Sequence, residues 1–142
     1  MNSRKDEQGN IIIVESTTKK ISIFLRLADE KHRRLIGVID IQHLTLHIER
    51  DREKHLLNKA NAYGFNYFIL DQAKRFNYVC LHESNGNVYL LDREKMIEDG
   101  KFLFFKQQGF EKQIFLSLDY LSQFKVTTEN KINLLKQRNA LQ

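Results

Sequence analysis

Basic and amide side chains gather in the segment 49–66, and the chemistry that they suit is the binding of phosphate oxygens. Arg52, His55 and Lys59 are spaced by three and four residues, so they would form one row along a helix. A solvated helix face without a ligand is the alternative interpretation, because exposed cations are the usual state of these residues. The candidate phosphate contacts of this segment are Arg50, Arg52, Lys54, His55 and Lys59.

The helix that would carry this row is predicted from about residue 52 to residue 63. Asp51 is a good N-cap, because its carboxylate can accept the amide hydrogens of the first turn. Gly64 fits the position just after the helix, where the backbone becomes left-handed and glycine is favoured. Apolar side chains at helical spacing, ending at Tyr63, would bury one face of this helix.

A second basic patch is predicted in the loop between strands at 101–106 and 112–118. Two adjacent glutamines stand there between two lysines. Glutamine can pair with adenine edges, and lysine can contact phosphate or guanine. A polar hairpin loop without a ligand is the alternative. The members of this patch are Lys106, Gln107, Gln108 and Lys112.

Acidic residues and histidines form a less specific pattern. His47 and Glu49 share one face of a predicted strand, with Asp40 on the neighbouring strand, so this trio could hold a divalent metal or transfer protons. Asp40, Glu49 and Lys54 are also the candidates for a metal-dependent nuclease, although the usual acid–spacer–lysine pattern is interrupted at 49–51. The alternative is the wet face of a hairpin. Neither a paired-cysteine motif nor a helical zinc spacing occurs, so no metal or cofactor is predicted.

Composition indicates one folded domain. The chain has 142 residues, a net charge of +5, 42% hydrophobic residues and 29% charged residues. Residues 1–9 are predicted to be a flexible polar tail, and 10–142 a single domain. A cytoplasmic location is expected, because the N-terminus lacks an apolar leader, no run is long enough for a membrane helix, and only one cysteine occurs. That residue, Cys80, lies in the middle of a predicted strand and is interpreted as a small buried hydrophobe.

The elements that must position these residues are predicted as β-hairpins followed by helices. In the hairpin 35–49, alternation places Val38 opposite His47 and Ile39 opposite Leu46. The Asn-Gly pair at 85–86 predicts a second hairpin, and the sequence Asp-Arg-Glu-Lys opens a helix after each of them, at 51–54 and 92–95. The predicted fold class is therefore α+β, a mostly antiparallel sheet built from hairpins that are each followed by a helix, with the helices packed on one face.

The leading functional interpretation is a small basic binding module for an anionic partner, nucleic acid first, which uses the helix row and the Lys/Gln loop. This function requires no covalent chemistry, so a non-enzymatic role is preferred. A protein–protein interaction module, such as an accessory or inhibitor subunit, is the second interpretation. A divergent metal-dependent nuclease is the third.

Overall fold

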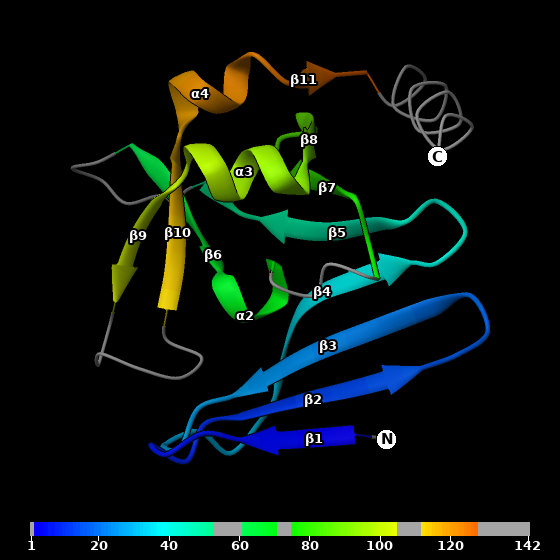
Figure 1. The fold of residues 1–142 in the computed structure, drawn as a ribbon, viewed down its shortest axis with the longest axis vertical. Coiled ribbons are helices and arrows are strands. Elements are labelled where there is room, and N and C mark those ends of the chain that lie inside the picture. The colour runs from blue at the N-terminus through cyan, green and yellow to red at the C-terminus, as the bar shows by residue number, and fades with distance from the viewer. Residues whose placement is uncertain (1, 53–60, 71–74, 105–111, 128–142) are drawn as a thin grey trace.

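The chain folds around one large mixed sheet, which Figure 1 shows in the computed structural model. The structure describes residues 2–52, 61–70, 75–104 and 112–127. The strands of this sheet lie in the order β1-β2-β3-β4-β5-β7-β8-β11. Their bounds are Asn2–Lys5 (β1), Ile11–Ser16 (β2), Lys20–Arg26 (β3), Arg34–Asp40 (β4), Thr45–Arg50 (β5), Tyr78–Glu83 (β7), Val88–Asp92 (β8) and Lys125–Val126 (β11).

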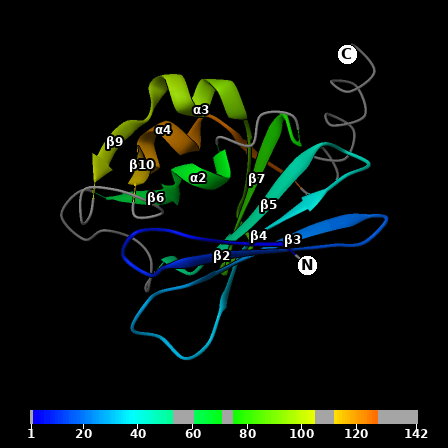
Figure 2. The same ribbon diagram turned by 60° about the horizontal axis from the view of Figure 1, so that its bottom comes forward.

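A second, three-stranded sheet lies on one side of the large sheet (Figure 2). Its order is β6-β10-β9, with bounds Ala62–Asn66 (β6), Lys112–Ser117 (β10) and Lys101–Phe104 (β9). Short helices accompany it, namely α2 (Tyr67–Leu70), α3 (Arg93–Asp99) and α4 (Leu118–Ser122). Buried side chains from both sheets, among them Leu46 and Phe65, belong to one hydrophobic core.

The hairpin of β4 and β5 has the register that the alternation of its residues predicts. Val38 pairs with His47 and Ile39 with Leu46. Ile39 and Leu46 are fully buried, whereas Val38 and His47 are half-buried on the opposite face. Because side chains alternate along a strand, burial of one face sets the register of the whole hairpin. This prediction is confirmed.

Other local signals also lead to the elements expected from them. Gly86 has a φ of 95° in the turn between the paired strands β7 and β8. α3 begins at Arg93, as the sequence Asp-Arg-Glu-Lys at 92–95 predicts, with Asp92 at its N-cap position, although that side chain makes no capping hydrogen bond. At α4 the Oγ of Ser117 accepts the amide hydrogen of Tyr120, with 3.1 Å between N and O.

One pair of neighbouring strands is parallel, whereas a mostly antiparallel sheet is predicted from the sequence. β5 pairs with β7 in parallel, from Thr45 opposite Tyr78 to Arg50 opposite Glu83. Parallel neighbours require a long crossover connection, and here that connection contains β6 and α2. The carboxyl-terminal ends of β5 and β7 therefore meet at the same edge of the large sheet.

The predicted α+β class is wrong. The described part of the chain is mostly β, with one large mixed sheet and short helices, and it is not a series of hairpins that each carry a packed helix. The layer opposite the large sheet contains a second sheet, and β6 of that sheet follows the β4–β5 hairpin. Residues 2–5, assigned above to a polar tail, form β1 and pair with β2.

The predicted end of the central helix is also wrong. Ala62–Asn66 is strand β6, and Gly64 lies opposite Phe115 of β10 rather than in a left-handed cap. Within the described residues, a positive φ occurs instead at Asn61, at 50°. Glycine at position 64 has a packing reason, because a Cβ atom there would lie 2.8 Å from Cε1 of Phe115. The body of the predicted helix, 53–60, lies outside the described residues.

Candidate functional site

The adjacent ends of β5 and β7 bring charged residues to the boundary of the core. On the core-facing side, Ile48 and Leu81 are buried, and the next residues on that side are Arg50 and Glu83, which pair directly across the two strands. Because side chains alternate along each strand, both charged side chains point to the face of the large sheet that packs against the second sheet. These two charged groups at the strand ends therefore mark a candidate functional site.

Glu83 is the acceptor of a buried hydrogen-bond network, here called the Glu83 network. Its carboxylate accepts two hydrogen bonds from the guanidinium of Arg52, at 2.9 Å from Nε and 2.8 Å from Nη2. The hydroxyl groups of Tyr63 and Tyr89 and the amide of Asn87 also donate to it. A buried carboxylate is tolerated when opposite charge and several donors replace water, as they do here.

The Glu83 network changes the acidity of its members. Burial acts to raise the pKa of Glu83, but hydrogen bonds, first from Arg52 and then from Tyr63, outweigh it and lower the pKa to about 2. Burial, followed by the hydrogen bond to Glu83, raises the pKa of the Tyr63 hydroxyl above its ordinary value. The carboxylate therefore stays ionised and the tyrosine stays a donor at neutral pH.

Acid should weaken the fold through Glu83. The pKa of Glu83 is lower in the folded protein, at about 2, than its ordinary value of 4.5 in the unfolded chain. Between these two pH values the unfolded chain therefore binds more protons. The stabilisation by the ionised carboxylate is complete above that window, falls as the pH decreases through it, and is lost below it. We expect the difference in the free energy of unfolding between wild type and Glu83→Gln to shrink by about 3 kcal/mol across this window. Urea unfolding at a series of pH values measures it, and a constant difference would contradict the assignment.

Arg52 therefore does not form part of a free cationic row. Its guanidinium is bound at both Nε and Nη2 by Glu83, and its side chain is 41% exposed. Hydrogen bonding to Glu83 is the largest effect on Arg52, and it raises the pKa of this guanidinium. The other members of the row, His55 and Lys59, lie outside the described residues, as does Lys54.

Arg50 has a different environment from Arg52. Its guanidinium donates to the backbone carbonyl of Glu49 at 2.9 Å and to that of Gly64 at 3.3 Å. The Arg50 Cζ atom lies 5.5 Å from the centre of the Phe65 ring. Burial lowers the pKa of Arg50 to about 10, and within the described part of the chain this group has no ion pair with a carboxylate. Arg50 thus carries a half-buried positive charge that is held by carbonyl oxygens.

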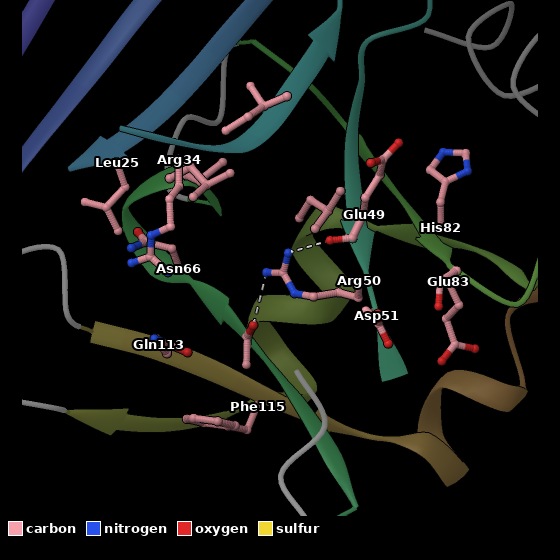
Figure 3. Close-up of a pocket in the computed structure, with 16 residues that line it drawn as sticks. Leu25, Arg34, Glu49, Arg50, Asp51, Asn66, His82, Glu83, Gln113 and Phe115 are labelled. Carbon is pink, nitrogen blue, oxygen red and sulfur yellow. Dashed lines mark hydrogen bonds between the residues drawn. The ribbon is translucent and has the colours of Figure 1, made fainter. Parts of the chain in front are cut away.

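Arg50 lies in a cleft between the two sheets, here called the Arg50 cleft (Figure 3). Figure 3 shows the two hydrogen bonds of its guanidinium as dashed lines, with the side chain of Glu49 turned away from it. The cleft has a volume of about 760 Å³, which is within the range of sites for small ligands. Apart from the charged strand end, its walls carry the amides of Asn66 and Gln113, the ring of Phe115, and Arg34.

Most of the Lys/Gln patch lies outside the part of the chain that the structure describes. Lys106, Gln107 and Gln108 lie outside it, and Lys112 begins β10, opposite Phe104 of β9. The hairpin of β9 and β10 itself is confirmed by that pairing. Gln113, the residue after Lys112, lines the Arg50 cleft but is not among the residues of the predicted Lys/Gln patch.

The histidines and acids are arranged differently from the predicted trio. Asp40 accepts hydrogen bonds from the backbone amides of Gln42 and His43, and its carboxylate lies 2.7 Å from Nδ1 of His43. His47 lies against His82 and Cys80 of β7 instead. The spacing Cys80-Leu81-His82 could have indicated this, because alternate residues of a strand share one face. Only the pairing of β5 with β7 adds His47.

Comparison with protein-family models, with curated proteins and with solved structures gives no match for this chain. No helix in the described part of the chain combines the length and the apolar character that crossing a membrane requires.

Proposed function

We propose that this protein is a binding module for single-stranded nucleic acid, and that it receives a phosphate group at Arg50 in the Arg50 cleft. The observation that carries the proposal is the half-buried guanidinium of Arg50, which has no carboxylate partner among the described residues. Burial of a charge is costly unless an opposite charge compensates it. An anionic group entering the cleft would supply that charge.

The geometry of guanidinium suits phosphate in particular. Arginine presents a planar set of donors that matches two oxygens of a phosphate group. Two of its nitrogens are already held by the carbonyls of Glu49 and Gly64, so the group is positioned before a ligand arrives. Preorganisation of this kind lowers the entropy cost of binding.

The rest of the Arg50 cleft suits the bases of an unpaired strand. The side-chain amides of Asn66 and Gln113 can both donate to and accept from base edges. Phe115 adds an aromatic ring to the wall, and Leu35, which is 57% exposed, adds an apolar surface at its rim. Unstacked bases are read by such combinations of amides and apolar or aromatic groups. A net charge of +5 would draw a polyanion toward the protein.

Replacing Arg50 with glutamine should weaken binding to a fluorescently labelled oligothymidylate at least about tenfold, as measured by anisotropy at low salt. The slope of log affinity against log salt concentration should fall by about one, because one phosphate contact is lost. Arg50→Lys keeps the charge but lacks the planar donors, so its affinity should lie between those of wild type and Arg50→Gln.

The matched control is Lys20→Gln, which removes the same charge from an exposed residue. Lys20 begins β3, whereas Leu25, which lines the cleft, lies near the other end of that strand. Its affinity should stay close to that of the wild type. Circular dichroism of each variant verifies that the fold is retained. Equal losses in Lys20→Gln and Arg50→Gln would contradict the assignment, as would tight binding of free phosphate or duplex DNA in preference to single strands. Paired DNA and RNA oligonucleotides of one sequence distinguish the two nucleic acids.

A further inference from the structure

The opposite face of β5 and β7 carries a second group of chemically active side chains. His47 pairs with Cys80 across the two parallel strands, and His82 follows Cys80 by two residues on the same face. The side chains of this face point away from those of Arg50 and Glu83, which are offset from them by one residue, although His82 also borders the Arg50 cleft. Within the described residues, His47, Cys80 and His82 form the group that could hold a metal ion.

The geometry brings three potential ligand atoms together. One ring nitrogen from each histidine and the Sγ of Cys80 all lie within 4.8 Å of one another. Nδ1 of His47 and Nε2 of His82 are 3.0 Å apart, and the two rings are stacked with centres 5.2 Å apart. In a tetrahedral zinc site, metal–ligand bonds of about 2.0 to 2.3 Å separate neighbouring ligand atoms by roughly 3.3 to 3.6 Å. Side-chain movements of about 1 Å would therefore suffice to close this group around one ion.

We propose that His47, Cys80 and His82 bind one Zn²⁺ ion and thereby join β5 to β7. Two imidazole nitrogens and one thiolate sulfur are the ligand types that zinc takes, whereas magnesium and calcium take oxygen ligands. Three protein ligands leave a fourth position for water or another donor. On binding, the thiol of Cys80 releases its proton to solvent and the sulfur donates an electron pair to the ion.

The surroundings of the cysteine favour a metal site over a nucleophile. Cys80 is fully buried and belongs to an apolar cluster with Tyr78, Val88 and Leu90. A catalytic thiolate must be reached by its substrate, so a buried sulfur argues against that role. The two histidines are half-buried, which leaves them closer to solvent and to an arriving ion.

The expected consequence of zinc binding is a more stable pairing of β5 with β7. An ion that binds the folded chain but has no assembled site in the unfolded chain stabilises the fold by mass action. The three ligands come from positions 47, 80 and 82, so one ion would connect strands that are separated by the whole crossover. We therefore expect the melting temperature of the metal-free chain to rise on addition of Zn²⁺.

Titration of the metal-free full chain with Co²⁺, a spectroscopic substitute for zinc, tests the proposal. We expect one equivalent to bind, with the visible bands of tetrahedral cobalt and a sulfur-to-cobalt charge-transfer band. Cys80→Ser should abolish the charge-transfer band, and His82→Gln should weaken Zn²⁺ binding by more than about 100-fold. This magnitude follows because loss of an outer-shell partner alone costs about 10- to 100-fold.

The matched control is His43→Gln, because His43 contacts Asp40 and does not belong to the proposed ligand set. It should bind cobalt and zinc as the wild type does, and so should Arg50→Gln, which separates this proposal from the function proposed for the cleft. Absence of a sulfur-to-cobalt band in the wild type would overturn the proposal, as would undiminished Zn²⁺ affinity in folded His82→Gln. Should Cys80→Ser fail to fold, the half-buried His82 variant still decides the outcome.

Discussion

Replacing Glu83 with glutamine should lower the free energy of unfolding by about 3 to 5 kcal/mol at neutral pH. The carboxylate is buried and receives two hydrogen bonds from Arg52, besides those from Tyr63, Tyr89 and Asn87. Glutamine has a similar shape but no charge, and its NH₂ group would replace one acceptor by a donor. The variant therefore loses the ion pair with Arg52, and its NH₂ group faces side chains that are themselves hydrogen-bond donors. Urea unfolding of the two proteins measures the difference.

Glu15→Gln is the matched control for this experiment. Glu15 also forms an ion pair with an arginine, Arg33, but both side chains are 40% exposed. Exposed ion pairs contribute about 0 to 1 kcal/mol, so this variant should unfold close to the wild type. If Glu83→Gln cost no more than Glu15→Gln, the Glu83 network would not have the structural importance assigned to it.

Replacing Gly100 with alanine should also destabilise the protein strongly, by about 2 to 3 kcal/mol. A Cβ atom at this position would approach Cγ1 of Ile114 and lie 2.5 Å from its Cδ1 and 2.7 Å from the backbone oxygen of Met96. Ile114 is fully buried, so it has little room to move away, and the carbonyl of Met96 accepts the hydrogen bond that ends α3. Thermal or urea unfolding of the variant measures the cost.

Gly86→Ala provides the comparison that separates crowding from backbone conformation. Gly86 has a φ of 95°, but a Cβ atom there would meet nothing within 4 Å. Its cost should therefore reflect only the left-handed backbone, about 1 kcal/mol. The crowding argument would fail if Gly100→Ala were as stable as Gly86→Ala or more so.

The parts of the fold that are predictable from sequence are those whose partners are near in the chain. The register of Val38 with His47 follows from alternation and a short turn, and the β7–β8 hairpin follows from Asn85-Gly86. β6 is not predictable in this way. Its residues 62 and 63 complete a helix-like pattern that Gly64 is expected to end, whereas its partner β10 begins at Lys112, far along the chain. Non-local pairing decides the structure of that segment, and local propensity does not reveal it.

In the candidate site too, residue types are predictable from the sequence, but contacts between distant residues are not. Arg50 and Arg52 are recognisable as cations from the sequence, but their roles differ because Glu83, 31 residues after Arg52, accepts from one of them only. The row predicted on a single helix therefore loses Arg52 to the Glu83 network. Cys80 and His82 are two residues apart on a strand, but their proximity to His47 exists only because β5 and β7 pair in parallel.

That parallel pairing also has a kinetic consequence. The β2–β5 meander and the β7–β8 hairpin join segments that are neighbours in sequence, so each can form early. β5 and β7 can meet only after the loop from residue 51 to residue 77 has closed, which costs more entropy. We therefore expect the two halves of the large sheet to form as separate units and to dock late in folding. The Arg50 cleft and the His47–Cys80–His82 group would then appear together in that last step, so ligand or metal binding during refolding would report the docking of the two halves.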